Sequence, residues 1–235
     1  MYLFYIRHAE PVYDPDGLTE TGVKQAEALK ERFLQYGLDK IYASSSERAI
    51  QTARPTAQAL KLDIEILDWA NEKYAGEEFG ALNKPQWCFA DEETKAIFGL
   101  KEILSLGNNW VDSDYFRNTG MRKGYYRVKS ETINFIESLG YKYDSEKETY
   151  KAEKPKYERV ALFAHGGFGY IFLSCLLNIP YPMFCTRFDT VGLSNVCVVE
   201  IKDEGEGIMP VLLQYSNDSH LYKNDLPREY GKQTF

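Results

Sequence analysis

Short apolar runs alternate with amphipathic stretches along the first seventy residues of the chain. Residues 2–6 form a continuous apolar run, which predicts one buried strand. From Val23 to Phe33, apolar residues recur every three or four positions, which predicts an amphipathic helix that ends at Gly37. Residues 41–43 and 62–67 predict two further strands around a second helix, and the later strand alternates apolar with polar residues. This order is typical of βαβ units, so we expect an α/β fold with a mostly parallel sheet.

Regular patterning lapses between residues 69 and 124. The pattern there predicts a loop, a helix around Glu92 to Leu106 and a turn region, which together are too long for a plain connection. We therefore expect an inserted helical cap at about residues 81–124, over the edge of the sheet, within a single domain that spans residues 1–235.

After residue 124 the regular pattern returns. In chain order it predicts a helix at 125–140, a solvated loop or hairpin at 141–156, a strand at 160–164, an apolar helix at 168–177 and strands at 191–201 and 211–215. The strand at 160–164 is apolar throughout, which is typical of strands buried on both faces of a parallel sheet. The charged segment at 141–156 is not expected to contribute to a core.

The chain of 235 residues carries a formal net charge of −7. This balance argues against a broad surface for nucleic acid or for anionic membranes, because each of these requires a basic face. Residues 160–186 contain no charged side chain and reach the length of a membrane span. Glycines and prolines interrupt this segment, so we expect a buried strand, a turn and a buried helix instead.

The four cysteines are widely spaced and form no C-x-x-C pair, which favours free thiols in a reducing compartment. The chain enters its first predicted strand directly after Met1, without the basic region or the small-residue cleavage site of a secretory signal. We expect a cytoplasmic protein.

Two predicted strands end in the same way, each delivering a histidine. Arg7 and His8 follow the first strand and His165 follows the strand at 160–164, although the chain contains only three histidines. Because ligands bind beyond the carboxyl ends of parallel strands, we expect both histidines at one edge of the sheet, with Arg48 beside them. Two guanidinium groups and two imidazoles repel one another unless an anion lies between them. The cluster therefore predicts a phosphate site, since arginine binds phosphate through paired hydrogen bonds.

A metal site is the competing use of these histidines. The chain has no H-E-x-x-H motif and no cysteine–histidine spacing of the metal-binding kind, and Arg7 and Arg48 would repel a divalent cation. We expect no metal and no other cofactor.

Five motifs, taken in order, resemble the histidine phosphatase superfamily, which has the phosphoglycerate-mutase-like fold. They are Arg7-His8-Ala9-Glu10, the segment LTETGVKQA at 18–26, the segment SSSERAIQTA at 44–53, Glu72 with Gly76 and Gly80, and His165-Gly166-Gly167. The resemblance runs from residue 2 to about residue 177, although residues 81–157 match only in layout. It implies a three-layer α/β/α sandwich.

The same resemblance implies a metal-independent phosphomonoester hydrolase, of the histidine acid phosphatase type, that works through a covalent phosphohistidine. His8 would be the nucleophile, and Arg7, Arg48, His165 and Gly166 would join it in binding the phosphoryl group.

Glu72 matches the position of the family's proton donor, which protonates the leaving oxygen. Glu77 and Glu78 are close rivals for this role, although a surface acidic run accounts for those two better than for Glu72. Glu10 is expected to orient the site rather than to react.

The chain departs from the family pattern beside the nucleophile. Ala9 stands where glycine is usual and Pro11 where serine or threonine is usual, so we expect a contact to phosphate to be lost there. Ser45 replaces the usual proline before Arg48. None of these changes removes a charged group.

The loop after the first motif separates two branches of the family. Only seven residues lie between Glu10 and Leu18, without the longer asparagine-containing loop of the mutases, and two glycines follow His165 as in the phosphatases. A phosphatase is therefore favoured. The alternatives are a phosphoglycerate mutase and a catalytically silent module that binds a phosphorylated ligand or a protein.

The expected partner is a small phosphorylated substrate whose organic part contacts the insertion. The candidate contacts are aromatic side chains for stacking and basic side chains for a second anion: Trp87, Trp110, Tyr125, Tyr126, Arg122, Lys123 and Arg127. The third histidine, His220, is expected to be structural. The sequence is compatible with either a monomer or a dimer.

Overall fold

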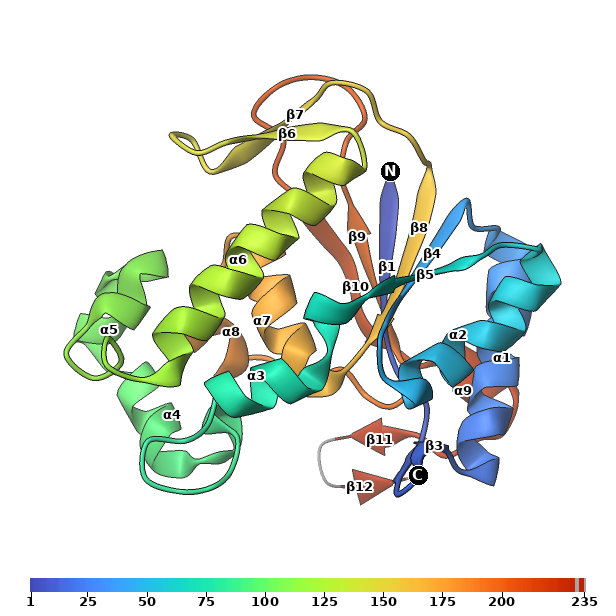
Figure 1. Ribbon diagram of the computed structural model, residues 1–235, viewed down its shortest axis with the longest axis horizontal. Coiled ribbons are helices and arrows are strands. Elements are labelled where there is room, and N and C mark those ends of the chain that lie inside the picture. The colour runs from blue at the N-terminus through green and yellow to red at the C-terminus, as the bar shows by residue number, and fades with distance from the viewer. Residues whose placement is uncertain (231–232, 235) are drawn as a thin grey trace.

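A computed structural model describes residues 1–230 and 233–234, and a six-stranded sheet forms the centre of this part of the chain (Figure 1). In spatial order the strands are β10 (Val211–Asn217), β9 (Val196–Glu200), β1 (Tyr2–Arg7), β8 (Arg159–Ala164), β4 (Lys40–Ser44) and β5 (Ile64–Leu67). The strands β1, β8, β4 and β5 run parallel, while β9 is antiparallel to both of its neighbours. The prediction of a mostly parallel sheet is confirmed.

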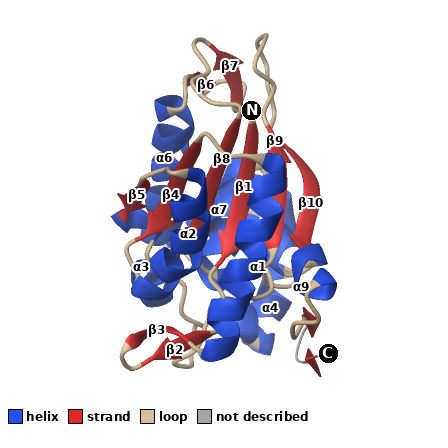
Figure 2. Cartoon of the chain, turned by 90° about the vertical axis from the view of Figure 1, so that its right-hand side faces the viewer, coloured by secondary structure: helices blue, strands red, loops and turns tan. Residues whose placement is uncertain are grey.

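Helices cover both faces of this sheet, which gives the expected three-layer α/β/α sandwich (Figures 1 and 2). One face carries α1 (Glu20–Tyr36), α2 (Glu47–Leu60) and α9 (Ser219–Lys223). The other face carries α3 (Glu72–Glu78), α6 (Gly120–Ser138), α7 (Gly166–Leu176) and α8 (Tyr181–Cys185).

The central strand β1 contributes to the cores on both faces because its side chains alternate. Phe4 and Ile6 pack into one core with α1 and α2, whereas Leu3 and Tyr5 pack into the other core with α6 and α7. All four side chains are buried. The apolar side chains of this strand are therefore buried on both faces of the sheet, and its polar end lies at the edge of the sheet.

The helix α1 begins where its sequence motif requires. The Thr19 hydroxyl accepts a hydrogen bond from the Gly22 N–H at 3.0 Å, and Gly37, at a φ of 72°, ends the helix. A Cβ atom at Gly22 would collide with the carbonyl oxygen of Glu10. Glycine at this position therefore lets the first turn of α1 lie directly against the loop that follows the first motif.

The inserted region folds as several short helices rather than as one longer helix. They are η1 (Asp68–Ala70), η2 (Cys88–Ala90), α4 (Glu92–Phe98), α5 (Lys101–Ser105) and η3 (Gly107–Asp112). The single helix expected around Glu92 to Leu106 is wrong, because α4 ends at Gly99 and Leu100 adopts an extended conformation before α5. The existence of a separate cap at 81–124 within one domain stays a prediction.

Three further expectations are corrected. The loop after the first motif is a hairpin of β2 (Pro11–Tyr13) and β3 (Asp16–Leu18). The segment 141–156 contains the hairpin of β6 (Tyr141–Asp144) and β7 (Thr149–Ala152), which was one of the two expected alternatives. The expectation that it does not contribute to a core is wrong, because Tyr141 and Tyr150 are buried there. In β5, Ile66 is exposed because this strand lies at the edge of the sheet.

The late strands are also shorter or longer than expected. β9 begins at Val196 rather than Val191, since residues 191–195 form a turn that supports the site described below. A final pair of short strands, β11 (Glu229–Tyr230) and β12 (Gln233–Thr234), follows α9. All four cysteines are free thiols, and the described helices include none that is both long and apolar enough to span a membrane.

Candidate active site

The carboxyl ends of β1 and β8 bring two histidines together. These strands pair in parallel with Arg7 opposite Ala164, and the His8 N–H donates a hydrogen bond to the Ala164 carbonyl at 2.9 Å. The imidazole rings of His8 and His165 therefore lie with their centroids 5.2 Å apart. Both rings are almost completely buried. The convergence expected from the sequence is present.

The hydrogen bond at Nδ1 of His8 fixes the tautomer of this ring. Nδ1 lies 2.8 Å from the carbonyl oxygen of Ala9, which can only accept, so Nδ1 carries the proton and Nε2 has a free lone pair. Burial, followed by the charge of Arg7, lowers the pKa of His8 to about 3. The imidazole is therefore neutral near pH 7, as a nitrogen nucleophile must be.

His165 is held in the opposite tautomer. Its Nδ1 lies 3.2 Å from Nη2 of Arg48, which can only donate, so its Nε2 carries the proton and donates to Oγ of Ser44 at 2.8 Å. Burial, followed by His8 and the two arginines, lowers the pKa of His165 well below its usual value. The buried Tyr5 hydroxyl also donates to the His165 carbonyl.

Arg48 lies at the centre of the polar contacts in the site. Nη1 donates to Asp16 at 2.8 Å, and Nη2 lies 3.6 Å from Oε2 of Glu72. The hairpin β2–β3 positions Asp16, which also accepts from the backbone N–H of Glu47 at 2.8 Å. The guanidinium is thereby fixed at the start of α2.

Arg7 approaches the site from the end of β1. Its Nη1 donates to the Val191 carbonyl at 2.9 Å. A Cβ atom at Gly166 would lie 3.2 Å from the Arg7 guanidinium carbon, so glycine lets Arg7 lie against the start of α7. Among the described residues, the buried Nε atoms of Arg7 and Arg48 have no hydrogen-bond partner. Two buried cationic donors without partners suit an anion.

Glu72 joins this cluster, whereas its two rivals do not. Oε1 of Glu72 accepts from the Gly167 N–H at 2.8 Å, and Oε2 lies 3.6 Å from Nδ1 of His165. Glu78 instead pairs with Arg127 at 2.6 Å, and Glu77 is exposed. The geometry therefore favours Glu72 over both rivals as the carboxyl group that can reach the reacting atoms.

The residues that follow His8 make their hydrogen bonds within the protein. The Ala9 N–H donates to the Thr52 hydroxyl at 2.9 Å, so this amide is already engaged within the protein. The carboxylate of Glu10 accepts from the Thr19 hydroxyl at 2.6 Å, which agrees with an orienting role. Glu10 is thus tied to the cap of α1.

A cation could use some of the same groups. His8, Glu72 and His165 offer ligand atoms that all lie within 4.8 Å of one another. Nη2 of Arg48, however, lies 3.2 Å from one of the imidazoles and 3.6 Å from the carboxylate. A divalent cation there would be close to a fixed positive charge, so the cluster suits an anion better.

Two of the expected substrate contacts in the insertion, Trp110 and Tyr125, are wrong. Trp110 and Tyr125 are buried in the core, and Arg127 is bound by Glu78. Trp87 is different, because a Cβ atom at Gly167 would lie 2.7 Å from its ring. It therefore lies against the start of α7, beside the site.

Two groups that support the site were not indicated by any sequence motif. Asp16 carries no motif of its own, and its role depends on the hairpin that folds it toward Arg48. The turn at 191–195 contacts both Arg7 and His8. The Val191 carbonyl accepts from the Arg7 side chain, and the Asn195 carbonyl accepts from the Arg7 backbone N–H. The Ser194 N–H donates to the His8 carbonyl at 3.1 Å. Ser194 adopts a left-handed φ of 63°, which no sequence pattern indicated.

Comparison with known families finds a match for the amino-terminal part of the chain. The family description "histidine phosphatase superfamily (branch 1)" matches residues 3–87, which include the first three strands of the parallel part of the sheet and Arg7, His8, Arg48 and Glu72. The part of the chain at residues 3–87 is thus similar to the histidine phosphatase superfamily. No curated protein matches it in sequence.

Solved structures of several phosphatases share the fold at low sequence identity. A phosphoserine phosphatase from Entamoeba histolytica superposes with a TM-score of 0.58 at 16% identity, covering 94% of this chain and 98% of that one. A mycobacterial glucosyl-3-phosphoglycerate phosphatase gives 0.59 at 17%, covering 92% and 99%. An α-ribazole phosphatase from Shigella flexneri gives 0.59 at 18%, covering 92% and 96%. At these identities the likeness establishes the fold.

Proposed function

We propose that the protein is a metal-independent phosphomonoester hydrolase that forms a covalent phosphohistidine on His8. The observation that carries the proposal is the state of His8, a buried neutral imidazole whose Nδ1 is bound to the Ala9 carbonyl and whose Nε2 is free. His165 and two arginines surround it, so a phosphate dianion would neutralise their repulsion.

In the first step, Nε2 of His8 attacks phosphorus while the bond from phosphorus to the ester oxygen breaks. Arg7, Arg48 and His165 bind the phosphoryl oxygens and stabilise the charge on them, and Gly166 at the start of α7 leaves room for this. Glu72 gives its proton to the leaving oxygen, which departs as an alcohol.

In the second step, water attacks the phosphorus of the phosphohistidine. Glu72, now a carboxylate, takes a proton from the water as the phosphorus–nitrogen bond breaks and the electron pair returns to Nε2. Inorganic phosphate leaves, and both His8 and Glu72 regain their starting protonation states. The hydrogen bond from Nδ1 to Ala9 stabilises the positive charge on the ring between the two steps.

The direct test is hydrolysis of 4-nitrophenyl phosphate by the protein before and after dialysis against EDTA. We expect sustained release of phosphate in both samples and its loss in His8→Ala, with circular dichroism to show that the variant is folded. Tight phosphate binding without hydrolysis would instead indicate a silent binding module. Interconversion of phosphoglycerates stimulated by a bisphosphate would indicate a mutase, and activity that EDTA abolishes would contradict the metal-independent mechanism.

A further inference from the structure

A pocket of about 760 Å³ lies between α4, α7 and the segment after α8. Its lining includes the rings of Phe89, Tyr170 and Phe188. We propose that this pocket binds the organic part of the substrate and selects phosphomonoesters whose alcohol carries an aromatic or similarly bulky ring. The inference rests on the proposed phosphatase function and adds the class of its substrate.

One wall of the pocket begins at the phosphate-binding end of α7. Tyr170 follows Gly166 by four residues on this helix, which is a rise of about 6 Å. Trp87 lies against Gly167, and its ring centroid is 5.2 Å from that of Phe89. Phe89 in turn lies 4.9 Å from Tyr170 in an edge-to-face arrangement. Aromatic side chains therefore extend without a break from the start of α7 into the pocket.

The opposite wall also begins at the site. The Val191 carbonyl accepts the hydrogen bond from Arg7, and the preceding residue, Thr190, lines the pocket. Further along the same segment, the Phe188 carbonyl accepts from the Tyr170 hydroxyl at 3.0 Å. A substrate whose phosphate is bound by Arg7 would thus extend its organic part between these two walls.

The chemistry of the lining favours an uncharged ring over a second anion. Glu92 and Asp189 offset Lys95 and Arg187, and Lys95 pairs with Glu92 at 2.7 Å. The hydroxyl of Tyr170 is already bonded. The ring of Phe188 stacks on Phe184 at 4.7 Å, and it is 37% exposed, so part of it remains accessible to a ligand. A pocket of this size accommodates a small organic molecule.

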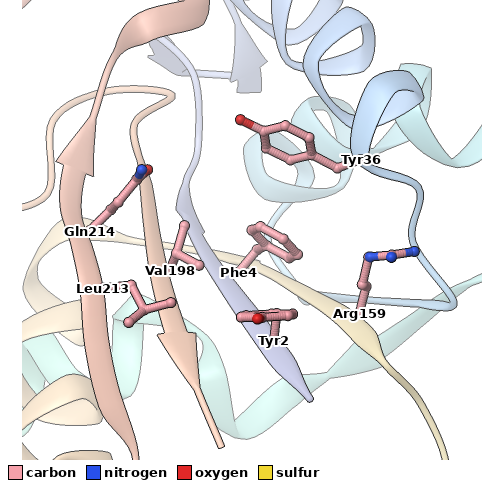
Figure 3. Close-up of a pocket in the computed structure, with 7 residues that line it drawn as sticks. All are labelled: Tyr2, Phe4, Tyr36, Arg159, Val198, Leu213 and Gln214. Atoms are coloured by element: carbon pink, nitrogen blue, oxygen red, sulfur yellow. The ribbon is translucent and has the colours of Figure 1, made fainter.

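A second groove lies too far from Arg7 to bind the organic part of the substrate. Figure 3 shows that Tyr2, Phe4, Tyr36 and Arg159 line it. Tyr2 begins β1, five residues before Arg7, and a strand of that length spans about 17 Å. The groove lies toward the amino end of the strand, so the organic part of a small ester bound at Arg7 does not reach it.

Two alkyl esters test the proposal without changing the leaving group. Propyl phosphate and 3-phenylpropyl phosphate both release a primary alcohol, so the ratio of their kcat/KM values measures the contribution of the phenyl ring to recognition. We expect 3-phenylpropyl phosphate to be favoured about tenfold or more, because packing of one aromatic ring is worth at least this factor. Phe188→Ala should remove most of the preference, whereas Tyr115→Ala, at an exposed ring outside the pocket, should leave it unchanged.

The possible failures are distinguishable. Equal kcat/KM values for the two esters, with turnover that still depends on His8, would overturn the substrate class but leave the phosphatase proposal intact. A ring preference that survives in both Phe188→Ala and Phe89→Ala would overturn the placement of the ring in this pocket. Absence of hydrolysis of either ester by the folded wild-type protein would overturn the proposed function and, with it, this inference.

Discussion

Acidification should destabilise the protein through His220, which lies outside the candidate active site. Its side chain is 4% exposed, its Nε2 lies 3.0 Å from Oγ of Ser194, and its Nδ1 lies 3.4 Å from Nη1 of Arg32. Burial, followed by the charge of Arg32, lowers the pKa of His220 to about 3 from the usual value of 6.5. The folded protein therefore holds this imidazole neutral where an unfolded chain would protonate it.

The sign and size of the effect follow from these two values. Between pH 6.5 and pH 3 the unfolded chain binds a proton at His220 that the folded protein does not, so the free energy of unfolding falls as the pH falls. At pH 5, about 1.5 units below the unfolded pKa, each unit is worth about 1.36 kcal/mol. His220 should thus account for a loss of about 2 kcal/mol on going from pH 7 to pH 5.

Urea unfolding of the wild type and of His220→Asn at pH 7 and pH 5 measures this loss. The variant is expected to be less stable at both pH values, because contacts with Ser194 and Arg32 are changed, but its drop between them should be smaller by about 2 kcal/mol. Subtracting the decrease in unfolding free energy of the variant from that of the wild type cancels the contributions of His8, His165 and the carboxylates. Equal drops in the two proteins would refute the account of His220.

Two further substitutions probe the site and the loop that supports it. Glu72→Gln should lower kcat/KM, which reports the steps up to release of the alcohol, about 100-fold for propyl phosphate but far less for 4-nitrophenyl phosphate, since nitrophenolate leaves without a proton. The exposed Glu77→Gln is the matched control, and equal losses for both esters would contradict the role of Glu72 as proton donor. Gly22→Ala should lower the free energy of unfolding by at least about 2 kcal/mol in urea, because its methyl group collides with the Glu10 carbonyl. Gly99→Ala is the matched control, because its methyl group would lie 3.4 Å from the Ala96 carbonyl oxygen, and it should change the free energy of unfolding by less than about 1 kcal/mol. Similar losses in the two variants would contradict the steric explanation.

The convergence of the charged residues was predictable because it follows from sheet topology. Arg7, His8 and His165 all lie just at or beyond the ends of apolar runs, and the ends of parallel strands meet at one edge. The start of α2 adds Arg48 for the same reason. The structure needed only the parallel pairing of β1 with β8 to bring the two imidazoles within 5.2 Å.

The supporting contacts were not predictable because they depend on contacts between distant segments. Asp16 reaches Arg48 only after its hairpin folds toward α2, and the turn at 191–195 supports Arg7 and His8 only after β9 pairs with β1. The aromatic residues of the insertion show the same limit. Composition alone does not distinguish a ring that completes a core, such as Trp110, from one at the site, such as Trp87.

Chemical trapping of the phosphorylated protein tests the central proposal most directly. The wild type is mixed with 4-nitrophenyl phosphate, quenched in alkali after milliseconds to seconds, digested and analysed by mass spectrometry. We expect one phosphoryl group on the peptide that contains His8, appearing before the steady state, decaying as the substrate is exhausted and absent from His8→Ala. Steady hydrolysis with no phosphoryl group on His8 at any time, or with the group on another residue, would contradict the mechanism.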